Sequence, residues 1–379
     1  MKWKNQYHEF DKIAEYFCDK RTKYYLWGTA NIAANMFRLC GHEINIVGAV
    51  DSDKKRWGQK IGRVTIESPD VLNPKEGYVI LVTTSAYEQV KEVLLKKGFE
   101  ENINFWDYFI FYQIYQLYAH NKLYSRRIDI SLTERCTLKC RKCNMFMPYF
   151  QTPADLSEES VQTMVDKYFA LIDFVESFNL LGGEPFLYDS LPEIIKYVGN
   201  KYRERLEHFK VFTNGMILPE KGLLELIRKY DVEIQISDYT SEVPYQKRID
   251  QLKTLFDEVG VRYYIIKTST WGDFGFPENP NNICEGDLIS FFEHCKAPFR
   301  GLYKDRVYFC YLEASAVRAG LFEENENDYF DLNQKDKYIK QKFLEFDFGY
   351  SLNGAVSFCR VCRGCYPQNK LSVPSAEQM

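Results

Sequence analysis

The chain has 379 residues, of which 45% are hydrophobic, so it can form two or three domains with sizeable cores. Its formal net charge is −4 and it has no basic stripe, which argues against nucleic acid as a partner. Without an apolar run of eighteen residues or an apolar leader, we expect neither a membrane span nor a signal peptide. The eleven cysteines are then more readily metal or cluster ligands than disulfides, and we expect a cytoplasmic, oxygen-sensitive protein.

The first part of the chain has a strand–turn–helix–strand pattern. A buried strand at 24–27 leads into Gly28, a helix follows from 31 to about 40, and a strand at 44–50 ends at Asp51. An acidic residue 23 positions after the glycine is the layout of a dinucleotide-type site. However, alanine replaces the second glycine of that motif and the third is missing, so a scaffold or docking domain is an equally good interpretation.

The region from 24 to about 106 resembles small Rossmann-like nucleotide-binding domains of nucleotide-sugar and surface-polysaccharide proteins. In the stretch 51–58 an aspartate is followed by basic residues and a glycine, which adds to the resemblance. The resemblance implies that residues 1–105 form a Rossmann-like domain, with Gly28 and Asp51 in its nucleotide site.

Aromatic side chains crowd the segment 106–124. We predict that this segment is a linker helix that packs between domains, because such density implies contact on more than one side. The aromatic residues are Trp106, Tyr108, Phe109, Phe111, Tyr112, Tyr115 and Tyr118.

Three cysteines with C-x3-C-x2-C spacing follow a strand-like stretch at 126–133. They are Cys136, Cys140 and Cys143. A loop with this spacing can supply three thiolates to an iron–sulfur cube and leave the fourth iron open to a small molecule. The alternatives are three buried thiols or a partial zinc knuckle, although no fourth Cys or His lies close by in sequence.

A second apolar run at 178–181 ends in a Gly-Gly-Glu-Pro motif. In order and spacing, this motif and the cysteine loop resemble the signature of the radical S-adenosylmethionine (SAM) superfamily. The resemblance implies a 4Fe–4S cluster whose open iron is chelated by the amino and carboxylate groups of SAM. It also implies that Glu184 receives the SAM amino group and that the glycines let the backbone approach the cofactor closely. The cofactor-binding motif comprises Gly182, Gly183, Glu184 and Pro185.

From 126 to 267 strands and helices alternate, which predicts a parallel sheet covered by helices. Ligands lie at the carboxyl ends of strands in such folds, and both motifs fall there, as do Asn214 and Ser237. These two residues could bond the ribose or the carboxylate of SAM, although a plain turn is the simpler interpretation of Asn214. The resemblance supplies a partial (βα)6 barrel over 125–283, whose sixth strand cannot be placed from the sequence.

The last third of the chain holds a second group of cysteines. Two single cysteines and a C-x2-C-x2-C run could build a tetrahedral thiolate site for zinc or iron–sulfur. The layout resembles the SPASM and Twitch auxiliary-cluster domains, and only five cysteines favour the shorter Twitch type. The resemblance implies a small domain over 284–379 with a second 4Fe–4S cluster; a zinc ribbon is the alternative. The expected ligands are Cys295, Cys310, Cys359 and Cys362, with Cys365 spare. After Leu371 we expect a polar, mobile tail.

The strand and helix pattern predicts an α/β protein, and the resemblances imply that it is a radical SAM enzyme of the oxidoreductase type. Such an enzyme cleaves SAM reductively to a 5′-deoxyadenosyl radical, with electrons from a flavodoxin or ferredoxin, and abstracts hydrogen from a substrate. The first domain suggests dehydrogenation or epimerisation of a nucleotide-linked sugar or surface-polysaccharide precursor. A peptide-modifying enzyme is the alternative, and a non-catalytic iron–sulfur binding or sensing protein is a remote one.

Overall fold

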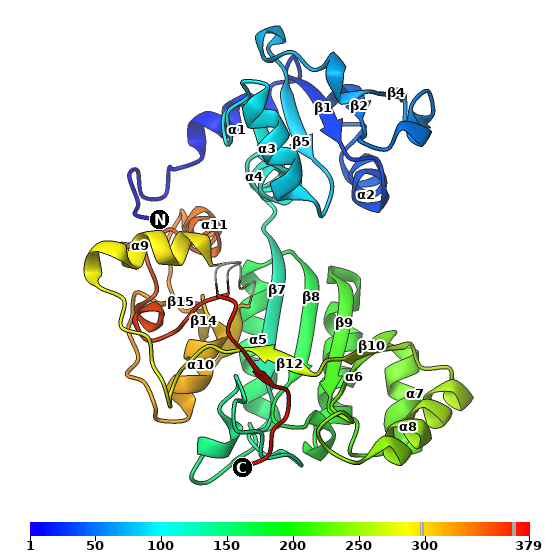
Figure 1. The fold of residues 1–379 in the computed structure, drawn as a ribbon, viewed down its shortest axis with the longest axis vertical. Coiled ribbons are helices and arrows are strands. Elements are labelled where there is room, and N and C mark those ends of the chain that lie inside the picture. Colours follow the sequence, from blue (N-terminus) through cyan, green and yellow to red (C-terminus); the bar gives the residue numbers. More distant parts are fainter. Residues whose placement is uncertain (296, 298, 366–368) are drawn as a thin grey trace. The chain divides into compact units, whose positions relative to one another are not determined.

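The computed structural model describes residues 1–295, 297, 299–365 and 369–379. It divides into a first unit, residues 8–122, and a second unit, residues 1–7 with 123–379. Each unit is built on its own mainly parallel sheet with helices, as Figure 1 shows. Within these described ranges, no helix is long and apolar enough to cross a membrane.

The first unit contains a six-stranded sheet in the order β3-β4-β2-β1-β5-β6, in which only β3 runs antiparallel to its neighbour. The strands are β1 (Lys23–Trp27), β2 (Asn45–Val50), β3 (Lys60–Ile61), β4 (Val64–Glu67), β5 (Val79–Val82) and β6 (Phe105–Asp107). The helices are α1 (Asp11–Cys18), α2 (Asn31–Leu39), α3 (Tyr87–Lys96) and α4 (Tyr108–His120). The five parallel strands have the spatial order of a doubly wound sheet.

The aromatic segment forms strand β6 and helix α4 of the first unit. The helix begins later than predicted, because Asp107 ends β6 and its carboxylate accepts a hydrogen bond from the Phe109 N–H at 2.8 Å, capping α4. The Phe111 ring packs against the rings of Phe17 and Tyr24, with centroids 4.8 and 5.3 Å away. The aromatic density therefore serves the core of this unit.

The second unit contains an eight-stranded sheet in the order β11-β10-β9-β8-β7-β13-β14-β15. The parallel strands are β7 (Tyr124–Ser131), β8 (Phe174–Leu181), β9 (Leu206–Thr213), β10 (Val232–Asp238) and β11 (Tyr263–Lys267). Helices α5 (Glu158–Leu171), α6 (Leu191–Tyr202), α7 (Lys221–Lys229) and α8 (Gln246–Val259) alternate with them. The Ser157 hydroxyl accepts from the Ser160 N–H at 3.2 Å and caps α5.

The other edge of β7 is extended by a short antiparallel group. The strands are β13 (Gly301–Tyr303), β14 (Arg306–Tyr308) and β15 (Tyr329–Asp331), and the remaining helices are α9 (Glu285–His294), α10 (Tyr311–Arg318) and α11 (Ile339–Asp347). β13 joins the sheet in parallel through one pair, Gly301 with Asp129. The sheet is thus continuous from the parallel strands to the part of the chain that carries the second group of cysteines.

The parallel series differs from the six strands that were expected. In the described part of the chain, the run of alternating strands and helices has five strands, β7 to β11, and β13, also parallel to β7, lies at the other edge of this run. After β11 the chain forms β12 (Thr270–Gly272), which pairs antiparallel with β16 (Ser372–Pro374). β12 has only three residues, exposed or half-exposed, and lacks the apolar run of a buried parallel strand. The tail expected to be mobile is also different, because Ser375 and Ala376 are fully buried.

Candidate active site

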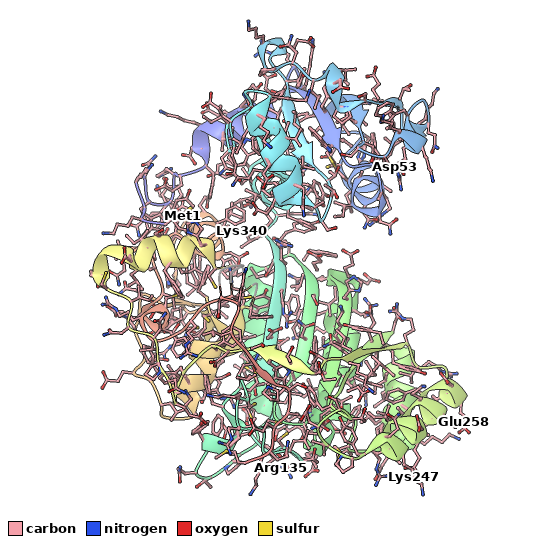
Figure 2. The ribbon with its side chains drawn as sticks, viewed as in Figure 1. Met1, Asp53, Arg135, Lys247, Glu258 and Lys340 are labelled. Carbon is pink, nitrogen blue, oxygen red and sulfur yellow. The ribbon has the colours of Figure 1, made fainter. Side chains whose placement is uncertain are left out.

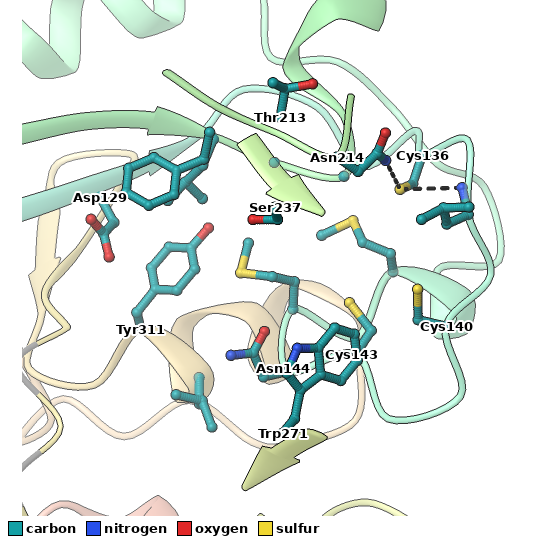
Figure 3. Close-up of a pocket in the computed structure, with 18 of the residues that line it drawn as sticks. Asp129, Cys136, Cys140, Cys143, Asn144, Thr213, Asn214, Ser237, Trp271 and Tyr311 are labelled. Atoms are coloured by element: carbon teal, nitrogen blue, oxygen red, sulfur yellow. Dashed lines mark hydrogen bonds between the residues drawn. The ribbon is translucent and has the colours of Figure 1, made fainter. Parts of the chain in front are cut away.

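A cavity of about 270 Å³ lies at the carboxyl ends of the parallel strands of the second unit (Figure 3). Its walls come from the loop after β7, the ends of β8, β9 and β10, strand β12 and the start of α10. Figure 2 labels Arg135, which lies in the loop after β7 at this end of the sheet. The structure thus brings the three cysteines, Gly182, Gly183, Asn214 and Ser237 to one cavity.

The three thiols of the cysteine loop face this cavity, and N–H groups point at their sulfurs. The Cys136 Sγ accepts from the Leu138 N–H at 3.5 Å and from Asn214 Nδ2 at 3.7 Å, and Cys140 Sγ accepts from Gln378 Nε2 at 3.5 Å. Burial raises the pKa of Cys136 to about 12 and that of Cys140 to about 11. Burial also raises the pKa of Cys143, against opposing backbone N–H groups. Without a metal, these thiols are therefore protonated at neutral pH.

The two glycines of the Gly-Gly-Glu-Pro motif lie against the backbone of the cysteine loop. The Gly183 N–H donates to the Thr133 carbonyl at 2.8 Å, and the Glu184 N–H donates to the Arg135 carbonyl at 2.9 Å. A Cβ on Gly183 would lie 2.2 Å from the Arg135 oxygen, and one on Gly182 would lie 2.6 Å from the Thr133 oxygen. The absence of side chains therefore permits close packing on the cysteine loop, a role that the sequence analysis assigned only to the cofactor.

Glu184 lies behind the cavity wall and is fully buried. Its Oε1 accepts from the Thr213 hydroxyl at 2.8 Å and the Phe186 N–H at 3.1 Å, and its Oε2 accepts from the Asn214 N–H at 2.8 Å. Burial raises the pKa of Glu184 to about 7, and the three hydrogen bonds oppose this shift. The carboxylate thus ties the end of β8 to the end of β9 and uses about three of its four acceptor positions, and its contact with the SAM amino group stays a prediction. Pro185, also buried, begins the short turn that Glu184 caps.

Asn214 contacts the cysteine loop more directly than the sequence suggested. Besides the Cys136 sulfur, its Nδ2 donates to the Thr137 hydroxyl at 3.0 Å. The turn interpretation also holds, because Gly215 has a φ of +76° and its N–H donates to the Thr213 hydroxyl. Ser237 lies between the two ends of the cavity in Figure 3. Contacts of Asn214 and Ser237 with SAM stay a prediction.

The end of the cavity away from the cysteines is formed by residues that the sequence analysis missed. Asp129, on β7, accepts hydrogen bonds from Arg127 Nε at 2.8 Å and Asn179 Nδ2 at 2.6 Å. Burial raises the pKa of Asp129, although Arg127 and Asn179 favour its ionised form. The Arg127 guanidinium lies 4.7 Å from the ring centroid of Phe299, and Figure 3 shows the Tyr311 ring beside Asp129. The Arg-x-Asp pair in β7 was the available signal, because alternate residues of a strand share one face.

In the first unit, Gly28 and Asp51 lie at the ends of neighbouring strands, as predicted. Gly28 has a φ of +104°, in the left-handed region that favours glycine. The Asp51 Oδ2 accepts from the Thr29 N–H at 3.0 Å and from the Thr29 hydroxyl at 2.5 Å, and its Oδ1 accepts from the Asp53 N–H at 2.9 Å. The carboxylate therefore holds its own turn together, and its binding of a ribose hydroxyl stays a prediction.

Residues 130–262 match the family model described as the radical SAM superfamily. This segment is a radical SAM domain. Membership implies an enzyme that uses a 4Fe–4S cluster and SAM. In the first unit, residues 20–103 match a model described as C2185-like, N-terminal.

Curated relatives of the chain include GTP 3',8-cyclases. The one from Limosilactobacillus fermentum is 29% identical over 97 residues, 25% of this chain and 28% of the relative, and the one from Aquifex aeolicus is 37% identical over 100 residues, 25% and 29%. The chain therefore spans less than a third of the length of these relatives.

Similar solved structures have low identity. BtrN in complex with AdoMet and 2-DOIA is 16% identical with a TM-score of 0.43, covering 64% of this chain and 94% of BtrN. SuiB from Streptococcus suis is 15% identical with a TM-score of 0.32, covering 70% and 58%. Native anSMEcpe with bound AdoMet is 17% identical with a TM-score of 0.32, covering 39% and 44%.

The cysteine loop of the radical SAM domain fits the cluster that the superfamily implies. Cys136, Cys140 and Cys143 open onto one cavity, and hydrogen-bond donors face their sulfurs, as thiolate ligands need. Since the metal-free thiols are protonated at neutral pH, binding of the cluster must displace their protons.

The second group of cysteines also lies together, in a buried region between α9, α10 and the turn at 357–360. Burial, with the neighbouring thiols of Cys362 and Cys295, raises the pKa of Cys310. Burial, with the neighbouring thiols of Cys310, Cys362 and Cys295, also raises the pKa of Cys359, and burial raises the pKa of Cys362 to about 12. Cys365 lies near Cys295 and Cys362, so the four expected ligands and the spare cysteine are neighbours in the fold, and their role as ligands stays a prediction. Among the described residues, no three His, Cys, Asp or Glu side chains are arranged to hold a single metal ion.

Proposed function

We propose that this radical SAM enzyme abstracts a hydrogen atom from a nucleotide-linked sugar or a surface-polysaccharide precursor and thereby dehydrogenates or epimerises it. The observation that carries the proposal is the cavity with the cysteine loop at one end and the Arg127–Asp129 pair at the other.

The Arg127–Asp129 end offers both donors and acceptors for hydroxyl groups. The Arg127 Nε–H donates to the Asp129 carboxylate, so the other guanidinium N–H groups can donate to a sugar oxygen. Asp129 can accept from a sugar hydroxyl, and the aromatic faces of Phe299 and Tyr311 suit the apolar side of a ring. The curated relatives are named for a nucleotide substrate, GTP, which is the chemical class of the proposed carrier.

When bound, the cluster and SAM supply the 5′-deoxyadenosyl radical that takes the hydrogen atom. The protein must orient the reacting carbon and exclude water and stray hydrogen donors. Met145, Met147, Leu181 and Trp271 line the cavity with apolar surface, which serves the second task. In a dehydrogenation, Asp129 could accept the proton of the reacting hydroxyl, because burial raises its pKa and makes its carboxylate a better base. The one remaining electron would need an acceptor, which the second cluster proposed below would supply.

The substrate proposal predicts that Arg127→Leu suppresses product formation and leaves uncoupled 5′-deoxyadenosine release. We expect kcat/KM for product to fall about a hundredfold, the factor for losing about 3 kcal/mol at a buried ion pair. Arg126→Leu, on the neighbouring position of β7 with a largely exposed side chain, is the control and should change little. The assay follows 5′-deoxyadenosine and product over a panel of nucleotide sugars and peptides. Turnover with peptides alone would show that the enzyme is a peptide modifier.

We further propose that the first unit recognises the nucleotide carrier. Trp57 and Trp27 report on this site, since Trp57 Nε1 donates to the Asp51 carbonyl at 2.8 Å and Trp27 Nε1 to the Ser52 hydroxyl at 3.4 Å. Nucleoside diphosphates should therefore quench tryptophan fluorescence, and Asp51→Asn should weaken binding about tenfold, whereas Asp70→Asn, at an exposed carboxylate, should not. A lack of response to uridine, guanosine and adenosine diphosphates would favour a scaffold.

A second 4Fe–4S cluster on Cys295, Cys310, Cys359 and Cys362 is part of the proposal, as is reduction by a flavodoxin or ferredoxin. Anaerobically reconstituted protein should hold about eight iron and eight sulfide per chain, and the variant without Cys359 and Cys362 about half of each. One zinc ion per chain, together with iron for only one cube, would instead identify a zinc ribbon.

A further inference from the structure

Residues 372–379 lie along the cysteine loop of the radical SAM domain. Strand β16 pairs with β12, with Val373 opposite Trp271, whose side chain lines the cavity. Figure 1 shows this red segment passing β12 and continuing toward the loop after β7. The Ser375 N–H then donates to the Ser269 carbonyl at 3.0 Å, and Ser375 is fully buried. The residues that follow β16 are therefore fixed before they reach the cysteines.

The backbone of residues 376–379 bonds directly to the cysteine loop. The Arg141 N–H donates to the Glu377 carbonyl at 2.7 Å, and the Met379 N–H donates to the Lys139 carbonyl at 2.9 Å. Ala376 is fully buried against Leu138 and Cys140. Its φ of +54° is uncommon for a residue with a Cβ and persists only where the surroundings determine it. We call residues 375–378 the strap.

The orientation of the Gln378 side-chain amide is fixed by an N–H donor at its oxygen and a carbonyl acceptor at its nitrogen. Its Oε1 accepts from the Lys139 N–H at 2.8 Å, whereas its Nε2 donates to the Ala376 carbonyl at 2.5 Å. The second Nε2 hydrogen is then free for the Cys140 sulfur, 3.5 Å away. Cys136 accepts from Leu138 of its own loop and from Asn214, whereas the donor to Cys140 comes from a residue 238 positions away.

We propose that the strap positions Cys140 and that the Gln378 amide raises the reduction potential of the cluster on the cysteine loop. Reduction adds negative charge to the cluster and its thiolates, so an N–H donor stabilises the reduced form more than the oxidised form. Gln378 is thus a positioning and tuning residue. The inference about potential rests on the implied cluster, whereas the inference about position concerns the protein alone.

The potential is tested with Gln378→Leu, which keeps the size of the side chain and removes the donor. In a redox titration followed by electron paramagnetic resonance, the cluster is identified by the change of its signal on addition of SAM. At the wild-type midpoint, the ratio of reduced to oxidised cluster should fall about fivefold, the factor for one net hydrogen bond. Ser372→Ala, on the exposed edge of the same segment, should leave it unchanged. An unchanged midpoint in Gln378→Leu would overturn the tuning role.

The position is tested in metal-free protein with Ala376→Asp, which should lift the strap because it buries a carboxylate against Leu138. Alkylation of Cys140 by iodoacetamide, followed by mass spectrometry, should become about tenfold faster. The exposed Cys284 is the internal reference and should react at the same rate. If Ala376→Asp does not fold, Gln378→Leu is the second variant, and in it the rate of Cys140 alkylation should rise by a smaller factor. Unchanged alkylation of Cys140 in both variants would overturn the positioning role, whether or not a cluster binds. If alkylation is faster in the variants but the reconstituted wild type holds no cluster on this loop, only the cluster assignment is overturned.

Discussion

Simultaneous replacement of Cys136, Cys140 and Cys143 by alanine should abolish reductive cleavage of SAM. The three thiols open onto the same cavity, and the superfamily match implies a cluster in this domain, which we predict that they hold. Without thiolates no iron can be held there, so we expect 5′-deoxyadenosine formation to fall to the background of a reaction without enzyme. Anaerobic assay with dithionite and SAM measures it, together with the iron content.

The same variant should keep its fold, which separates loss of chemistry from loss of structure. Cysteine and alanine are both small and apolar, and the metal-free thiols are protonated, so their removal deletes no buried charge. Far-ultraviolet circular dichroism should match that of the wild type. Cys284→Ala, at an exposed thiol outside both cysteine groups, is the control and should cleave SAM normally. Deoxyadenosine release at the wild-type rate by the triple variant would contradict the assignment of the loop.

The convergence of the cavity-lining motifs could be predicted from the sequence because local signals determine it. Alternating strands and helices place successive parallel strands side by side, and their carboxyl ends then share one edge of the sheet. The Ser157 cap and the Gly-Gly-Glu-Pro turn are likewise local. The cysteine loop, Gly182 and Ser237 therefore reach one cavity, as expected.

The features that the sequence did not reveal depend on pairs of residues far apart in the chain. Gln378 contacts Cys140, and β12 pairs with β16 over about a hundred positions, with no periodicity in either short strand to predict it. The sixth strand of the barrel could not be placed from the sequence, and after β11 the chain forms β12 in this antiparallel pairing. The sequence indicated a cofactor contact for Glu184 but not its bonds to Thr213 and Asn214. These bonds could not be predicted because they form only when β8 and β9 lie side by side. In each case the partner is chosen by tertiary packing.

The largest structural effect should come from Gly183→Ala. Its Cβ would lie 2.2 Å from the carbonyl oxygen of Arg135, 2.6 Å from the carbonyl carbon and 2.9 Å from the Cβ of Cys136. All three atoms belong to the backbone or the root of a side chain, so no rotamer change can relieve the clash. The cysteine loop must move away from β8 and lose the bonds from Gly183 N–H to Thr133 and from Glu184 N–H to Arg135.

We therefore expect Gly183→Ala to lower the free energy of unfolding of the metal-free protein by about 3 kcal/mol. It should also reduce the iron bound by the cysteine loop to less than about half of the wild-type amount, because a displaced loop no longer presents three thiols to one cavity. Anaerobic urea unfolding and iron analysis of reconstituted protein measure the two effects. Gly222→Ala in α7, where a Cβ would meet nothing within 4 Å, is the matched control and should stabilise the protein by up to about 1 kcal/mol. Equal stability and iron content in the two variants would show that the cysteine loop does not depend on its packing against Gly183.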